Sequence, residues 1–200
     1  MAHLHTLAGQ HDLTVSAFVV RTDGVPRVLM HRHKVQGVWI QPGGHVELDE
    51  DPWTALAREL VEETGYAPGQ LRVLQPALRA PELTGAVVHP QPVCVSTHLF
   101  GYAGDHWHTD LTYALVTDAD PAGEPGTGES QELRWFTRDE LAALPDGQTH
   151  PNVRELGLFV LDRVSGAWEG VEWTTVMRVE DDPHTPVRLG HRYPLIGADE

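Results

Sequence analysis

Residues 43–66 read GGHVELDEDPWTALARELVEETGY, and this stretch predicts a short amphipathic helix that follows a glycine-rich turn. Asp51 is a suitable N-cap, Pro52 fits the first helical position, and Gly65 can end the helix. At 100° per residue the apolar side chains form one stripe that can pack against a sheet. The stripe consists of Trp53, Leu56, Ala57, Leu60 and Val61.

The other side of this helix is crowded with acidic residues. Glu59, Glu62 and Glu63 lie there, and Arg58 is the nearby cation. A solvated polar face is the ordinary explanation, but two penalties argue against it. Glu59 and Glu63 form a like-charge pair at i, i+4, which costs roughly 0.2–0.5 kcal/mol. Carboxylates in the last turn also oppose the helix dipole, at roughly 0.3–1 kcal/mol. A divalent cation over this face would remove both penalties, because Mg²⁺ prefers oxygen ligands.

The composition of the chain suits one globular domain that does not bind a nucleic-acid polymer. Its 200 residues are 40% hydrophobic and 22% charged. The net charge is −15 and Lys34 is the single lysine, so a substrate with phosphates would need a bound cation. We find no membrane-spanning run and no signal peptide. The single cysteine, Cys94, favours a cytoplasmic location.

The rest of the chain predicts strands mixed with helices, which indicates an α/β or α+β domain. Asp23-Gly24 between two apolar runs predicts a hairpin, and residues 41–44 (QPGG) predict a turn-forming loop. A further loop is expected at 117–130. Strands are expected at residues 13–20, 27–30, 37–40, 71–78, 93–100, 107–116 and 132–136.

Two more helices are expected towards the C-terminus. Thr137 and Glu140 form a capping-box pattern before the first, at residues 138–144. The second is expected at residues 152–164. Its apolar side would carry Leu156, Phe159, Val160 and Val164. Residues 166–200 contain one strand-like run, VEWTTVMRVE at 171–180.

Residues 44–66 resemble the box of the Nudix hydrolases. That box is a glycine, five residues, a glutamate, seven residues, and then Arg-Glu-aliphatic-any-Glu-Glu-any-Gly-aliphatic. Here Gly44 and Glu50 are followed by RELVEETGY, and only the last residue, Tyr66, departs from the pattern, at a position that packs rather than reacts. Trp39 before Pro-Gly-Gly and Trp135-Phe136 before a helix extend the resemblance over about residues 10–165.

The resemblance implies both a fold and a reaction. The fold is an α/β class Nudix-type α/β/α sandwich with a mixed β-sheet at residues 1–165, followed by a C-terminal extension of unknown role at 166–200. The reaction is metal-dependent hydrolysis of the pyrophosphate bond in a nucleoside diphosphate linked to another moiety, with Mg²⁺ or Mn²⁺ as cofactor. ADP-ribose, sugar nucleotides, dinucleoside polyphosphates and nucleoside triphosphates all remain open as substrates.

By position in the box, the resemblance also implies roles for single residues. Glu59, Glu62 and Glu63 would be metal ligands, joined in some members by the carbonyl of the first glycine of Pro-Gly-Gly, here Gly43. Arg58 would orient the glutamates.

Two other acids before the helix have less certain places. Glu50 would support the loop, and Glu47 could reach the metal or the substrate. The general base differs between members of the family. It is either a box glutamate or an acid in the loop before the last strand, where this chain offers Glu129 and Glu132, and we favour Glu129.

Several residues outside the box are candidates for substrate binding. Arg32, with His33 and Lys34, could contact phosphate or ribose, or could simply lie in an exposed turn. Trp39, Trp107 and Tyr113 could stack on a base, although core positions are the alternative. Gln41 stands where the family usually has an apolar residue and could alter substrate choice.

His106, His108 and Asp110 alternate along one expected strand, so their side chains would share a face of the sheet. Three interpretations stay open for them. They could be surface residues, they could line the substrate pocket, or they could bind a transition metal.

Two other functions are compatible with this family. A catalytically silent Nudix-like nucleotide-binding or regulatory domain would normally have lost box glutamates, and this chain retains them. Isopentenyl diphosphate isomerase shares the fold but needs a cysteine upstream of the box, whereas Cys94 lies downstream. The expected partner is a small nucleotide derivative, and a homodimer is possible because many relatives dimerise.

Overall fold

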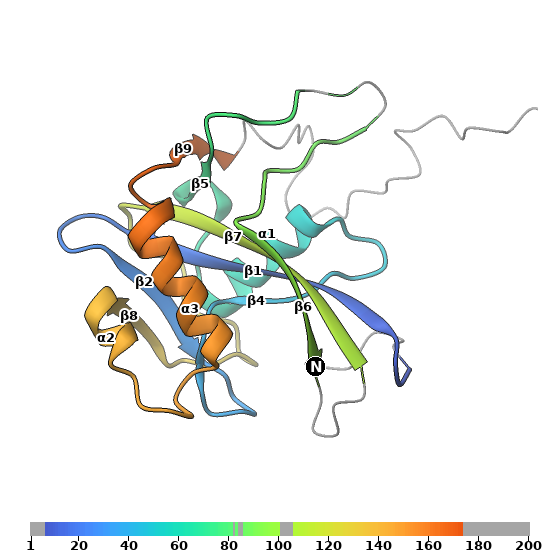
Figure 1. Cartoon of the computed structure of the whole chain (residues 1–200), viewed down its shortest axis with the longest axis horizontal. Helices are drawn as coiled ribbons and strands as arrows, with labels where there is room; N and C mark the ends of the chain where they lie inside the picture. Colours follow the sequence, from blue (N-terminus) through green and yellow to red (C-terminus); the bar gives the residue numbers. More distant parts are fainter. Residues whose placement is uncertain (1–6, 82, 84–85, 101–105, 174–200) are drawn as a thin grey trace, which may run out of the picture.

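The computed structural model describes residues 7–81, 83, 86–100 and 106–173, and it confirms the expected α/β/α sandwich built on a mixed β-sheet (Figure 1). The strands are β1 His11–Arg21, β2 Arg27–Arg32, β3 Trp39–Ile40, β4 Gly43–His45, β5 Arg72–Gln75, β6 Cys94–Phe100, β7 His106–Thr117, β8 Leu133–Thr137 and β9 Glu169–Glu172. The helices are α1 Pro52–Thr64, η1 Pro68–Gln70, α2 Arg138–Ala142, α3 Pro151–Phe159 and η2 Val160–Val164.

The long strands β1 and β7 form the centre of the sheet. They pair in parallel from His11↔Trp107 to Arg21↔Thr117, and the order along the sheet is β3-β2-β1-β7-β5-β9. Strand β4 also pairs with β1, β6 pairs with β7, and β8 pairs with β2, all antiparallel. The expected hairpin is confirmed as β1–β2, with Val19 opposite Leu29.

The prediction of a loop through residues 41–44 is wrong for its second half. Gly43 and Gly44 belong to strand β4 and pair with Ser16 and Val15 of β1. The reason is close approach of the two backbones: a Cβ atom on Gly43 would lie 2.2 Å from the carbonyl oxygen of Val15. Glycine is therefore required here for pairing rather than for a turn.

Each face of the sheet is covered by different helices. Helix α1 packs on one face, where Trp53, Leu56 and Leu60 are buried. Helices α2 and α3 cover part of the other face, and α3 crosses in front of β1 and β2 in the view of Figure 1. The start and end of α1 are as expected, with the Asp51 side chain accepting hydrogen bonds from two backbone amides and Gly65 left-handed at φ 73°.

The last helix buries most of the apolar side that was expected, since Val160 and Val164 are buried and Leu156 packs against the core. Helix α3 continues into the π-helical turn η2, and its buried side is formed by Val153, Gly157, Val160 and Val164. Phe159 is the exception: it is 45% exposed, so it does not share the buried side with Val160 and Val164. A Cβ atom on Gly157 would lie 2.8 Å from Leu141, which shows how closely this side approaches the core.

Beyond residue 165 the chain adds one more strand to the sheet. Strand β9 pairs with β5, and the Trp173 ring stacks on Trp53 with centroids 4.0 Å apart. The remainder of the expected strand, residues 174–180, lies outside the described residues. Within the described ranges, no helix is both long and apolar enough to cross a membrane.

Candidate active site

The acidic helix turns two of its glutamates into the protein. Glu59 and Glu63 are 5% and 2% exposed, whereas the Glu62 side chain is 51% exposed. The backbone N–H of Gly43 donates to Glu63 Oε2 at 2.8 Å. Gly44 faces Glu59 so closely that a Cβ atom there would lie 2.2 Å from Glu59 Oε1. A solvated polar face therefore does not describe this side of α1.

Arg58 joins the glutamates to the loop that precedes the helix. Its guanidinium donates to both carboxylate oxygens of Glu50 at 2.8 and 2.9 Å and to the His45 carbonyl at 3.0 Å. It also donates to Glu59 at 2.8 Å and to Glu62 at 3.3 Å. The hydrogen bonds to Glu50 raise the pKa of Arg58, so it remains a cation. This geometry suits the orienting role that the box implies.

Two hydrogen bonds from backbone N–H groups join Glu47 and Glu50 in the loop before the helix. The backbone N–H of Glu47 donates to Glu50 Oε2 at 3.2 Å, and the N–H of Glu50 donates to the Glu47 carbonyl at 3.1 Å. These bonds suit the role of loop support expected of Glu50.

Burial makes the negative charges on the helix costly. It raises the pKa of Glu63 well above its ordinary value, opposed by the hydrogen bond from Gly43. Burial also raises the pKa of Glu59, opposed by Arg58. Two buried carboxylates that share a cluster with Glu62 are what a hard divalent cation requires. The residues present therefore fit Mg²⁺ or Mn²⁺.

His31 is a member of this cluster that the sequence reasoning missed. Its Nε2 lies 3.6 Å from Glu63 Oε2, and its ring is 3% exposed. Burial lowers its pKa to about 4, so the imidazole is neutral at pH 7. Neither ring nitrogen has a hydrogen-bond partner among the described residues. The available signal was a polar residue two positions after the core residue Leu29 on the same strand.

The loop before β8 closes over the C-terminal end of α1. The N–H of Gly126 donates to the Glu62 carbonyl at 2.7 Å, and the N–H of Gly123 donates to the Gly65 carbonyl at 3.1 Å. This places Glu129 close enough for its charge to raise the pKa of both Glu59 and Glu63.

The second acid of this loop lies elsewhere. Glu132 makes an exposed ion pair with Arg32, with 3.6 Å between Arg32 Nη1 and Glu132 Oε2. Arg32 also donates to the Gly37 carbonyl at 3.1 Å.

A second polar cluster occupies the sheet face opposite α1. Asp110 accepts hydrogen bonds from the hydroxyls of Thr14, Ser16 and Thr112 at 2.9, 2.7 and 2.7 Å. Gln41 Nε2 donates to Ser16 at 3.2 Å, so Gln41 faces this cluster. His106 and His108 are 5% and 6% exposed, and the interpretation of these histidines as surface residues is therefore wrong.

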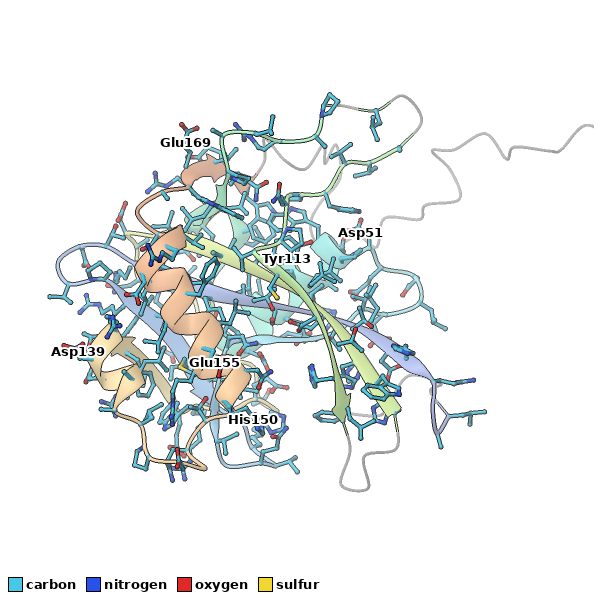
Figure 2. The ribbon with its side chains drawn as sticks, in the orientation of Figure 1. Asp51, Tyr113, Asp139, His150, Glu155 and Glu169 are labelled. Carbon is cyan, nitrogen blue, oxygen red and sulfur yellow. The ribbon has the colours of Figure 1, made fainter. Side chains whose placement is uncertain are left out.

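The aromatic candidates differ in position. Tyr113 is fully buried, with its ring 5.2 Å from Trp53 of α1, so we remove it from the substrate-binding set. Figure 2 shows Tyr113 on β7 and Asp51 at the start of α1. Trp39 is partly buried and packs edge-on against Phe136. Trp107 is 38% exposed.

Comparison with known proteins identifies the family of this chain. The NUDIX domain family model matches residues 10–156. A "MutT-like protein" from Streptomyces ambofaciens is 35% identical over 134 residues, which cover 66% of this chain and 68% of that protein. A "CMP-5'-(N-acetyl-N-hydroxy-3-aminopropyl)phosphonate hydrolase" from Streptomyces rubellomurinus is 33% identical over 158 residues, 76% of this chain and 66% of that protein.

A solved structure has the same fold. It is a NUDIX-family hydrolase from Clostridium perfringens, with a TM-score of 0.61 and 25% identity, and the match covers 76% of this chain and 96% of that one. Together with the family match over most of the chain, this likeness shows that the protein belongs to the Nudix hydrolase family.

Proposed function

We propose that this chain hydrolyses the pyrophosphate bond of a nucleoside diphosphate linked to another moiety, and that it needs Mg²⁺ or Mn²⁺. The observation that carries the proposal is the burial of Glu59 and Glu63 beside Gly43 and Gly44. Arg58 is the cation in contact with Glu59, and it is shared with Glu50 and Glu62. A bound cation would favour the charged form of both carboxylates, which burial disfavours.

We assign the metal to Glu59, Glu62, Glu63 and the carbonyl of Gly43. When bound, the cation neutralises phosphate oxygens and favours attack by water on phosphorus. The protein's own part is orientation: Arg58 holds Glu59 and Glu62, and the Gly43 N–H holds Glu63. These hydrogen bonds arrange the acids before the substrate arrives, which lowers the cost of reorganisation during the reaction.

Glu129 is our candidate for the general base. Water attacks one phosphorus, its proton passes to the Glu129 carboxylate, and the bond to the bridging oxygen breaks. A nucleoside diphosphate esterified to another group gives two phosphate monoesters, a triphosphate gives a nucleoside monophosphate and pyrophosphate, and a CMP-linked phosphonate gives CMP and the free phosphonate. The effect of the Glu129 charge on both buried glutamates supports this role, and the exposed ion pair that Glu132 makes with Arg32 argues against Glu132. The alternative base is a box glutamate, Glu62 or Glu63.

The substrate's nucleoside would lie beyond the glutamates. Arg32 of β2 and Trp39 of β3 are directly opposite each other in the antiparallel pair that these strands form. His106 and His108 lie on the sheet face opposite these glutamates, so we leave them out of the proposed substrate-binding set. The CMP-linked substrate in the name of one relative supports a nucleoside 5′-phosphate as the recognised half. We include in the proposal a cytoplasmic location and a small-molecule substrate rather than an RNA chain, given the net charge of −15.

The test is hydrolysis of a panel of nucleotides, first with Mg²⁺ and then with Mn²⁺. The panel contains ADP-ribose, sugar nucleotides, dinucleoside polyphosphates, nucleoside triphosphates and a CMP-linked phosphonate. We expect metal-dependent cleavage of one class that is lost in Glu63→Gln and retained in Glu132→Gln. Cleavage that persists in chelator, or no cleavage of any class while Mg²⁺ still binds, would overturn the proposal.

A further inference from the structure

A group of metal-ligand side chains lies on the sheet face opposite the box glutamates. Asp12 and His108 directly oppose each other on the parallel strands β1 and β7, and His45 comes from β4, opposite Thr14. One ligand atom from each of Asp12, His45 and His108 lies within 4.8 Å of the other two. Three strands that are distant in sequence thus bring two imidazoles and one carboxylate together.

We propose that Asp12, His45 and His108 form a second metal site, for a transition-metal ion of the Zn²⁺ class. Zn²⁺ binds imidazole nitrogen and carboxylate oxygen at about 2.0–2.2 Å in a tetrahedral arrangement, which puts neighbouring ligand atoms about 3.3–3.6 Å apart. His45 Nε2 lies 3.6 Å from Asp12 Oδ2, so this pair is already near the spacing that the ion requires.

His106 is the candidate for a fourth ligand. Its Nε2 lies 3.7 Å from Asp12 Oδ2 and 3.2 Å from His108 Nε2, again close to the tetrahedral spacing. Two imidazole nitrogens at this distance either share one hydrogen bond or bind one ion. Asp110, which the sequence grouped with His106 and His108, is not a proposed ligand. Both of its carboxylate oxygens already accept hydrogen bonds from hydroxyl groups.

The surroundings of the group suit a metal that is held within the protein. Asp12 and His108 are 7% and 6% exposed, and the Phe100 ring stacks on His108 with centroids 4.2 Å apart. His98 lies next to His108, with ring centroids 5.6 Å apart. A partly buried site with one carboxylate and two or three imidazoles favours Zn²⁺, Ni²⁺ or Cu²⁺ over Mg²⁺. The carboxylate oxygens of α1 instead favour Mg²⁺, which prefers oxygen ligands.

The proposed site would also hold strand β4 in place. His45 follows Gly44, which faces Glu59, and the His45 carbonyl accepts a hydrogen bond from Arg58. An ion bound to Asp12, His45 and His108 would link β1, β4 and β7. We therefore expect it to stabilise the folded chain rather than to take part in hydrolysis.

The test is calorimetric titration of the chelator-treated whole chain with Zn²⁺, in the presence of excess Mg²⁺. We expect one equivalent of Zn²⁺ to bind wild type and to raise its Tm. Asp12→Asn and His108→Asn should each weaken Zn²⁺ binding at least about tenfold. His11→Gln, an exposed neighbour of Asp12, should bind like wild type.

Two more variants keep the result decisive. Glu63→Gln should still bind one equivalent of Zn²⁺, because the Glu63 carboxylate belongs to the other site. If circular dichroism shows that Asp12→Asn is unfolded, His45→Gln is used in its place. Absence of Zn²⁺ binding in wild type would mean a hydrogen-bonded His–Asp network and would overturn the proposal. Binding lost in Glu63→Gln but kept in His108→Asn would overturn it as well. Hydrolysis is not a readout here, so this result is independent of the proposed reaction.

Discussion

At the scale of single residues, Glu63 lies in surroundings that disfavour a charged carboxylate in the metal-free protein. It is 2% exposed, it lies beside the neutral His31, and one backbone N–H donates to it. One hydrogen bond does not replace the hydration that a carboxylate loses on burial. A bound divalent cation would supply the missing interaction, so the strain on this residue is relieved only in the metal-bound state.

Glu63→Gln should therefore stabilise the metal-free protein. Because burial raises the pKa of Glu63, the folded protein holds this proton more tightly than the unfolded chain. Wild type then loses stability as the pH rises from the ordinary value of 4.5 through the raised folded pKa. In chelator, we expect the variant to have the higher Tm at pH 8, by about 2–4 °C for each kcal/mol relieved. The difference should vanish below pH 4.5.

Thermal melts with and without Mg²⁺ check this expectation. Mg²⁺ should raise the Tm of wild type more than that of Glu63→Gln. A variant that melts below wild type at pH 8 in chelator would show that the Glu63 charge is not a cost to the fold.

The sequence could predict the box glutamates because their spacing and their neighbours lie within one helix. It could not predict His31, since the approach of His31 to Glu63 depends on how β2 lies beside α1. It also could not distinguish Tyr113 from a base-stacking residue, because an aromatic side chain on a central strand suits either role. Only the packing of Tyr113 against Trp53 decides that question.

At the scale of elements, strand β4 and the loop at residues 117–130 bracket the helix glutamates. Strand β4 needs its two glycines for different reasons. Gly43 approaches the backbone of β1, whereas Gly44 leaves room for the Glu59 carboxylate. The second contact places a backbone next to a proposed metal ligand, which makes Gly44 a sensitive position.

Gly44→Ala should impair metal use without unfolding the chain. The added Cβ atom would lie 2.2 Å from Glu59 Oε1, so the carboxylate must move away from Arg58. We expect the Mg²⁺ concentration for half-maximal rate to rise at least about tenfold, a scale typical of disturbed ligand orientation. Gly69→Ala is the matched control, because its Cβ atom would meet nothing within 4 Å. Equal Mg²⁺ dependence in both variants would remove Glu59 from the ligand set.

The loop at residues 117–130 carries Glu129, the proposed general base. Glu129→Gln should lower kcat by roughly 10²–10⁴-fold, the usual contribution of a general base. The drop should be accompanied by a changed pH–rate profile, and Glu132→Gln should leave kcat and the profile near those of wild type. Steady-state rates measured across pH would test this. An unchanged profile in Glu129→Gln would move the base to Glu62 or Glu63.

At the scale of the whole molecule, the sheet separates two kinds of polar cluster. The acids of α1 and His31 lie on one face, whereas His106, His108, Asp12 and Asp110 lie on the other. Alternation along β7 could be read from the sequence, so the shared face of His106, His108 and Asp110 was predictable. The partners Asp12 and His45 were not, since the β1–β7 register and the β1–β4 register are set only by the folded sheet.

Residues of the C-terminal extension pack against the rest of the molecule. The Trp173 ring stacks on Trp53 and is 3% exposed, so it fills space above α1. We expect Trp173→Ala to lower the free energy of unfolding by about 3–5 kcal/mol, as for other buried large-to-small changes. Trp107→Ala, at a ring that is 38% exposed, is the control and should cost far less. Urea unfolding of both variants would measure the difference, and equal losses would contradict a core role for Trp173.

We propose that the glutamates of α1 hold the cation for pyrophosphate hydrolysis. This role is tested by kcat of wild type and Glu63→Gln on the best substrate of the panel, at saturating Mg²⁺. We predict that the variant retains its fold and less than about one tenth of wild-type kcat. A folded variant that keeps more than this fraction would contradict the account.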